Sequence, residues 1–97
     1  MKAAILYGSG DVRVEEKADP RPGRGEVLIR IRACGVCGTD AALFKGDYPA
    51  RTPVVIGHEF SGDIVETGAG VVGLGVGDRV TVDPNVICHE CEYCRSG

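Results

Sequence analysis

Three cysteines at a strict two-residue spacing, Cys88, Cys91 and Cys94, are the clearest chemical signal in the sequence. Thiolates at this spacing lie on one loop and can reach a single tetrahedral zinc ion at about 2.3 Å. A closed zinc site needs a fourth ligand, which would be His89 or a residue that follows further along. Polar neighbours such as Glu90 argue against buried core cysteines. The pattern therefore predicts a metal-binding loop.

An iron–sulfur cluster is the alternative for the same three cysteines. In the bacterial ferredoxin pattern the third cysteine is followed, four residues later, by a fourth cysteine and a proline. That position falls just after Gly97, so the spacing alone leaves zinc and iron–sulfur open.

A second set of residues that can bind metal is spread over the middle of the chain. Cys37 stands between Val36 and Gly38, and His58 and Glu59 follow Gly57. A thiol, an imidazole and a carboxylate are the mixed ligands that catalytic zinc uses while it keeps one position open for water or substrate. The pattern is not H-E-x-x-H, which excludes the helix of a metalloprotease.

Short apolar runs separated by glycine turns must position these ligands. Alternation of apolar and polar residues predicts a half-buried strand over Val27 to Ala33. Thr39 or Asp40 is expected to cap a short helix over Ala41 to Lys45, which Gly46 would end. The other expected elements are a hairpin of Lys2 to Leu6 with Asp11 to Glu15, and strands over Val54 to Ile56, Phe60 to Thr67 (weakened by Gly62) and Arg79 to Asp83. The sequence thus predicts a mainly β fold, a small, partly open barrel with a short helix and a metal-binding loop.

One glycine motif resembles a dinucleotide-binding fingerprint. The residues from Gly68 to Gly73 match G-x-G-x-x-G and follow an expected strand. A true fingerprint opens a helix whose N-terminus faces the pyrophosphate, but Gly75 and Gly77 interrupt the segment that should be helical. We interpret the motif as a turn.

The overall composition narrows the class of protein. Ninety-seven residues with a net charge of -3 make one domain without the basic stripe that nucleic acid needs, and no apolar run is long enough to span a membrane. The apolar run at the start of the chain is too short for a secretory signal. A reduced, cytoplasmic setting is therefore expected, and in that setting clustered cysteines usually bind metal. Cys34, the remaining cysteine, is expected to be a small buried thiol.

Taken together, five segments resemble the zinc-dependent alcohol dehydrogenases of the medium-chain dehydrogenase/reductase family. They are Gly35 to Asp40, Gly57 to Gly62, Val65 to Gly68, Gly77 to Val80 and the cysteine triplet, and their order and spacing cover essentially the whole chain. The resemblance implies that residues 1–97 are the N-terminal GroES-like catalytic domain, cut before the nicotinamide-binding Rossmann domain.

The same resemblance implies roles for single residues. Cys37 and His58 would bind the catalytic zinc, with Glu59 as an adjacent carboxylate that can bind or exchange at the metal. Thr39 would hydrogen-bond the substrate alcohol and begin a proton relay. Cys88, Cys91 and Cys94 would hold a structural zinc, with a fourth cysteine beyond Gly97.

The implied parent is an NAD- or NADP-dependent oxidoreductase that interconverts a small-molecule alcohol or polyol and its carbonyl, and it would be a homodimer or homotetramer. Residues 1–97 alone are expected to be inactive, because the cofactor domain is absent. Many polyol and threonine dehydrogenases of the family carry a relay histidine five residues after the first zinc cysteine, where this sequence has Ala42. Two other classes stay open, a small iron–sulfur electron carrier and a zinc-stabilised binding module without catalysis.

Overall fold

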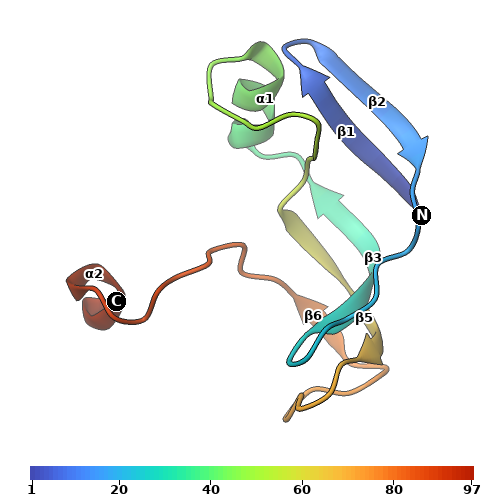
Figure 1. Ribbon diagram of the computed structural model, residues 1–97, viewed down its shortest axis with the longest axis vertical. Helices are drawn as coiled ribbons and strands as arrows, with labels where there is room; N and C mark the ends of the chain where they lie inside the picture. The colour runs from blue at the N-terminus through green and yellow to red at the C-terminus, as the bar shows by residue number, and fades with distance from the viewer.

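Glycine turns divide the chain into six strands and two short helices. The computed structural model describes residues 1–97 (Figure 1). The elements are β1 (Lys2–Gly8), β2 (Asp11–Glu16), β3 (Val27–Gly35), α1 (Gly38–Lys45), β4 (Val54–Val55), β5 (Glu59–Thr67), β6 (Arg79–Thr81) and α2 (Glu92–Ser96). This order confirms the predicted mainly β fold with its short helix.

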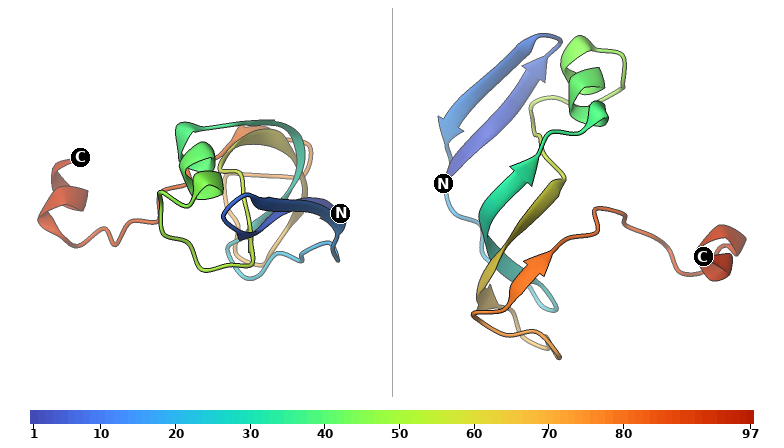
Figure 2. Two further views of the ribbon diagram at one scale, coloured as in Figure 1. Left: turned by 90° about the horizontal axis from the view of Figure 1, so that it is seen from above. Right: turned by 180° about the vertical axis from the view of Figure 1, so that it is seen from behind.

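The strands form two separate antiparallel sheets of three. One has the order β2-β1-β4 and the other the order β3-β5-β6. The hairpin of β1 and β2 has the predicted place, and its turn contains Gly10 at a φ of 74°, which glycine adopts without a steric cost. Figure 2 shows the two sheets at different levels of the molecule, so the barrel is open as predicted.

The longest pairing joins β3 to β5, and its register is irregular. The register shifts between Leu28 and Ile29 and again between Ile31 and Ala33. The first shift leaves Val65 of β5 as the extra residue, and the second leaves Arg32 of β3 as the extra residue. The prediction of a half-buried strand is wrong for the second half of β3, because Ile31 lines an open groove and is 49% exposed.

Gly62 does not weaken β5 as the sequence suggested. The strand runs without a break through nine residues, and Gly62 is one of the few buried positions. A Cβ atom there would overlap the carbonyl oxygen of Arg30. The glycine thus permits a close approach of β3 and β5, which is one of the uses of glycine inside a strand.

Few side chains are fully buried. The apolar core consists of Ala3, Ile5 and Leu6 from β1 and Ile64 from β5. No helix in the structure combines the length and the apolarity that a membrane crossing requires.

The helix α1 begins earlier than predicted, at Gly38, with Cys37 as its N-cap residue. Thr39 and Asp40 therefore lie inside the first turn, and the prediction that either one caps the helix is wrong. Asp40 instead accepts a hydrogen bond of 2.9 Å from the backbone N–H of Cys37. The predicted end is confirmed, because Gly46 closes the helix in the left-handed conformation with a φ of 85°.

The G-x-G-x-x-G segment forms a turn, as interpreted from the sequence. The next element after β5 is the strand β6 rather than a helix, and Gly70 and Gly73 have φ values of 80° and 81°. The turn is fixed by backbone hydrogen bonds of 2.8 Å from Gly25 to Ala69 and from Gly68 to Glu26. A pyrophosphate-binding helix N-terminus is absent here.

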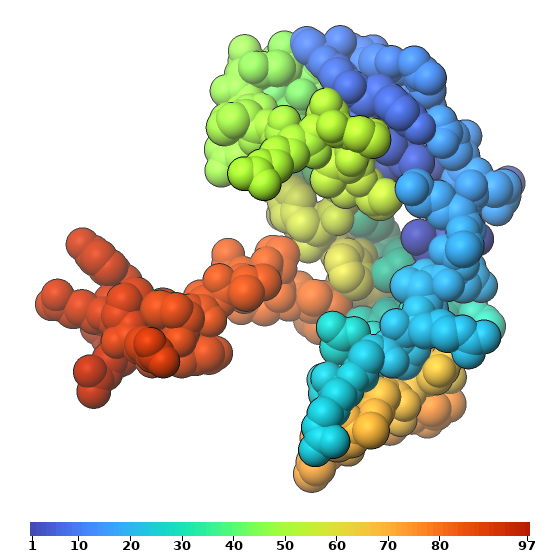
Figure 3. Space-filling view, viewed as in Figure 1, coloured from blue at the N-terminus to red at the C-terminus, as the bar shows by residue number.

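The last residues leave the sheets and form a projecting lobe. The strand β6 ends at Thr81 rather than at the predicted Asp83. Residues 82–91 contain no helix or strand, and α2, which the sequence analysis did not predict, follows them. Figure 3 shows this segment standing away from the body of the molecule. We refer to residues 84–97 as the cysteine lobe.

Candidate functional site

Two chain junctions bring the first set of predicted ligands together. Cys37 lies between β3 and α1, while His58 lies between β4 and β5 and Glu59 is the first residue of β5. One ligand atom from each of Cys37, His58 and Glu59 lies within 4.8 Å of the other two. One ion can contact three groups at this spacing after small side-chain movements, so the residues fit a zinc ion with an open position.

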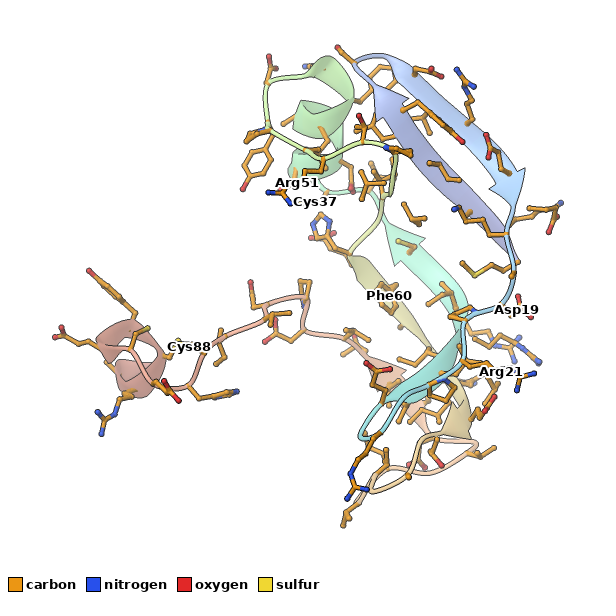
Figure 4. The ribbon with its side chains drawn as sticks, in the orientation of Figure 1. Asp19, Arg21, Cys37, Arg51, Phe60 and Cys88 are labelled. Atoms are coloured by element: carbon orange, nitrogen blue, oxygen red, sulfur yellow. The ribbon has the colours of Figure 1, made fainter.

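The β3–β5 pairing explains how distant residues meet. Gly35, the last residue of β3, is paired with Glu59, the first residue of β5. The next two residues carry the chain to Cys37, and Figure 4 shows Cys37 beside the start of α1. On the other side, Gly57 has a φ of 105°, which allows the chain to turn into β5 immediately before the ligands.

Asp40 is a further member of the site that the sequence analysis treated only as a possible cap. Its side chain is 9% exposed, and its Oδ1 lies 3.5 Å from Nδ1 of His58. This Oδ1 is buried and has no hydrogen-bond partner, while Oδ2 accepts from the backbone of Cys37. An imidazole that directs Nδ1–H toward a carboxylate leaves Nε2 free for a metal. The signal in the sequence is the spacing of three from Cys37, at which a first-turn carboxylate reaches back to the N-cap.

Thr39 also lies beside the cluster. Its Oγ1 is 3.7 Å from Sγ of Cys37, and the residue is exposed. A hydroxyl at this place can exchange hydrogen bonds with a molecule bound at the cluster and with solvent. Ala42, one turn further along α1, offers no group that transfers protons.

A groove of about 400 Å³ opens next to the cluster. It is lined by His58, Glu59 and Gly35, together with Thr81, Val82 and Pro84 at the end of β6 and just after it. Because two of the candidate ligands line it, a small molecule in the groove could reach the ion that they would hold.

The cysteine lobe brings the three late cysteines together. Sγ of Cys94 lies 3.3 Å from Sγ of Cys91 and 3.6 Å from Sγ of Cys88. In a tetrahedral site with bonds of about 2.3 Å, neighbouring sulfurs lie roughly 3.8 Å apart. The thiols therefore already approach the spacing of a zinc site. His89 is not part of the convergent group.

Local hydrogen bonds favour the metal-binding form of one thiol. The backbone N–H of Cys91 donates to Sγ of Cys88 at 3.4 Å. This bond, followed by that from the backbone of Glu90 and those from the neighbouring thiols, lowers the pKa of Cys88 to about 6. Cys88 is then largely a thiolate at neutral pH, the form that binds metal.

The fifth cysteine differs from expectation. Cys34 is exposed rather than buried, and it does not belong to either group of convergent ligands. Its sulfur faces Gly57, where a Cβ would lie 3.1 Å away, and a glycine has no side chain with which to cover it.

We predict that residues 84–95 are ordered only with metal bound. Three thiolates repel one another unless a cation lies between them, and the lobe has little packing to offset that repulsion, since Val86 is 100% and Tyr93 87% exposed. Hydrogen exchange after removal of zinc by a chelator should show rapid exchange of the Cys88 to Cys94 amides, while the amides around Ile31 and Val65 keep their protection. Full protection of the lobe without metal would contradict the assignment of these cysteines as ligands.

Two relatives resemble the whole of this chain. A sorbitol dehydrogenase of Halalkalibacterium halodurans is 49% identical over 100 residues, which cover 100% of this chain and 29% of that protein. An L-threonine 3-dehydrogenase of Pyrococcus furiosus is 42% identical over 101 residues, which cover 100% of this chain and 28% of that protein. The chain thus spans less than a third of the length of the relatives that it matches.

Solved structures agree with these relatives and with the fold. A cobalt- and zinc-bound alcohol dehydrogenase from Pyrobaculum aerophilum superposes with a TM-score of 0.88 at 37% identity, covering 100% of this chain and 30% of that one. An Escherichia coli CFT073 alcohol dehydrogenase in complex with NADH gives a TM-score of 0.89 at 38% identity, over 99% of this chain and 28% of that one.

The match to a family is equally direct. The alcohol dehydrogenase GroES-like domain matches residues 23–97, more than three quarters of the sequence. This region contains both groups of convergent ligands and the whole of the β3-β5-β6 sheet. The chain belongs to the alcohol dehydrogenase GroES-like domain family.

Proposed function

We propose that this chain is the catalytic domain of a zinc-dependent, NAD- or NADP-linked oxidoreductase that interconverts an alcohol or polyol and its carbonyl compound. The observation that carries the proposal is the convergence of Cys37, His58 and Glu59 beside a groove. Three protein ligands with an open position are the arrangement of a catalytic zinc site, whereas a structural site is closed. The polyol class is supported by the sorbitol dehydrogenase relative.

A zinc ion held by Cys37, His58 and Glu59 would act as a Lewis acid toward the hydroxyl oxygen of the substrate. The residues around it prepare the site. Asp40 holds the start of α1 through the Cys37 backbone, and its Oδ1, 3.5 Å from Nδ1 of His58, would orient the imidazole. The carboxylate of Glu59 is the most exposed of the three and would be the ligand that can exchange at the ion.

Thr39 is proposed to accept the hydroxyl proton of the substrate. Its own hydroxyl proton then passes to solvent, because the residue is exposed and position 42 is an alanine. A bound nicotinamide nucleotide would supply the hydride acceptor, so that one alcohol and one NAD(P)⁺ would yield one carbonyl compound, one NAD(P)H and one proton. The nicotinamide nucleotide would be bound outside residues 1–97.

An activity screen of the complete gene product tests this proposal. The substrates are polyols, L-threonine and simple primary and secondary alcohols, each with NAD⁺ and with NADP⁺. We expect reduction of the nucleotide with at least one hydroxyl substrate, loss of the reaction after chelation, and recovery with zinc. The absence of turnover over the whole screen, or turnover that complete metal removal leaves unchanged, would contradict the proposal. An absorption spectrum of the same sample addresses the iron–sulfur alternative, because zinc proteins do not absorb visible light.

Residues 1–97 alone should not reduce NAD⁺ with any of these substrates. The segment from Gly68 to Gly73 forms a turn that is hydrogen-bonded to residues 25 and 26, and it lacks the helix that would face a pyrophosphate. The purified 97-residue polypeptide, loaded with zinc, provides the measurement. Zinc-dependent NADH production that disappears in Cys37→Ser would show that this expectation is wrong.

A further inference from the structure

Gly35 ends β3 opposite Glu59, at the edge of the candidate metal site. An ideal Cβ at Gly35 would lie 3.0 Å from Oε2 of Glu59, 3.5 Å from its Cβ and 3.6 Å from its carbonyl oxygen. The carboxylate of Glu59 therefore lies closer to this position than a side chain at residue 35 would ordinarily allow. The same side chain contributes an oxygen to the convergent group with Cys37 and His58.

We propose that Gly35 is a positioning residue for the metal site: its missing side chain holds open the place from which the Glu59 carboxylate reaches the ion. This inference rests on the proposed function, because it assumes that Cys37, His58 and Glu59 bind a metal. It assigns to Gly35 a role in metal affinity and in substrate access, since Gly35 and Glu59 also line the groove together.

The backbone of Gly35 does not itself require glycine. Gly35 is not among the residues with a positive φ, and it pairs regularly with Glu59 at the end of the β3–β5 ladder. Alanine can adopt this extended conformation without strain. What alanine changes at this position is the free space beside the carboxylate.

The contact must be relieved mainly by the side chain of Glu59. The backbone of Glu59 is held by its pairing with β3, whereas the carboxylate is exposed and can rotate. A methyl group at 3.0 Å is closer than ordinary packing allows, so the carboxylate should move away from Gly35. We expect the displaced carboxylate to reach the ion less well.

The experiment is a double-mutant cycle of Gly35→Ala and Glu59→Ala in the complete gene product. Zinc affinity is measured by competition with a chromophoric chelator. The zinc ion that is lost in the Cys37→Ser variant is assigned to this site. Gly35→Ala should weaken zinc binding by roughly 10-fold to 100-fold, the range for residues that orient metal ligands. In the Glu59→Ala background the same substitution should change the affinity by less than about twofold, because the two effects share one cause.

Gly8→Ala is the matched control. Gly8 also ends a strand, has no positive φ, and leaves its Cβ position without a neighbour within 4 Å. It should leave zinc affinity unchanged. The far-ultraviolet circular dichroism spectrum and the melting temperature of each variant show whether the β3–β5 pairing is intact.

The possible results separate the inference from the function on which it rests. Unchanged or tighter zinc binding in Gly35→Ala overturns the role of Gly35 and leaves the metal site in place. An equal loss of affinity with and without Glu59 also overturns it, because Gly35 would then act through the backbone. If wild-type protein and Cys37→Ser retain the same amount of zinc, the proposed site fails, and the role of Gly35 fails with it.

Discussion

Substituting Cys37 by serine or His58 by alanine is expected to abolish the dehydrogenase activity of the complete gene product. Each substitution removes one of only three convergent ligands, and the remaining two cannot hold an ion with an open position. The loss should exceed about 10⁴-fold in kcat/KM, because the Lewis acid is lost together with the orientation of the substrate. Steady-state kinetics with the best substrate of the screen, combined with metal analysis, would measure both effects.

Two residues of the same types serve as controls. Cys34 is an exposed thiol three residues before Cys37, and His89 is the only other histidine. Neither belongs to a convergent ligand group. Cys34→Ser and His89→Ala should retain activity and both zinc ions. Near-normal turnover in Cys37→Ser or His58→Ala would remove the basis of the proposed mechanism.

The second large effect is expected at Thr39. Substitution by alanine removes the hydroxyl that lies 3.7 Å from Sγ of Cys37 and is proposed to accept the substrate proton. The rate of the chemical step should fall by roughly 10²-fold to 10⁴-fold, the contribution typical of general acid–base groups. A substrate deuterium isotope effect should report hydride transfer as rate-limiting in this variant.

Thr39→Ser is the matched variant, because serine keeps the hydroxyl and removes only a methyl group. It should have nearly normal kcat and KM, and both variants should retain zinc. Wild-type turnover and an unchanged pH profile in Thr39→Ala would show that the proton leaves by another route.

The ligands could be predicted from the sequence because their signal is local. Two-residue cysteine spacing and the Gly57-His58-Glu59 junction are visible without knowledge of the fold. The order and spacing of these motifs resemble one protein family, and the family match over residues 23–97 confirms that resemblance. The assignment of each residue to a metal stays a prediction.

Other features depend on geometry that the sequence conceals. Ile31 continues the apolar alternation of β3, but it lines an open groove rather than a packed core, so the alternation overestimated its burial. Cys34 was expected to be buried, but its neighbour Gly57 leaves it uncovered. The contact of Asp40 with Cys37 is local, but its approach to His58 joins segments that lie 18 residues apart in the sequence, which no local pattern encodes.

Glycines at turns indicate the boundaries of helices and strands better than the helix-capping preferences of single residues do. Gly46 ends α1 and Gly10 forms the first turn, as expected from the need for a positive φ. The start of α1 was misplaced because Cys37 is an unusual N-cap residue, and Thr39 and Asp40 are commoner ones. α2 was missed because its five residues are too few to show a period.

Anomalous diffraction at the zinc absorption edge is the most direct test of the central claim, that this domain holds two metal ions in different roles. Crystals of the complete gene product should give two anomalous peaks within this domain. One peak should lie between Cys37, His58 and Glu59, and the other between Cys88, Cys91 and Cys94. Scattering only from the cysteine lobe, with the first three side chains directed away from one another, would contradict the proposed catalytic site.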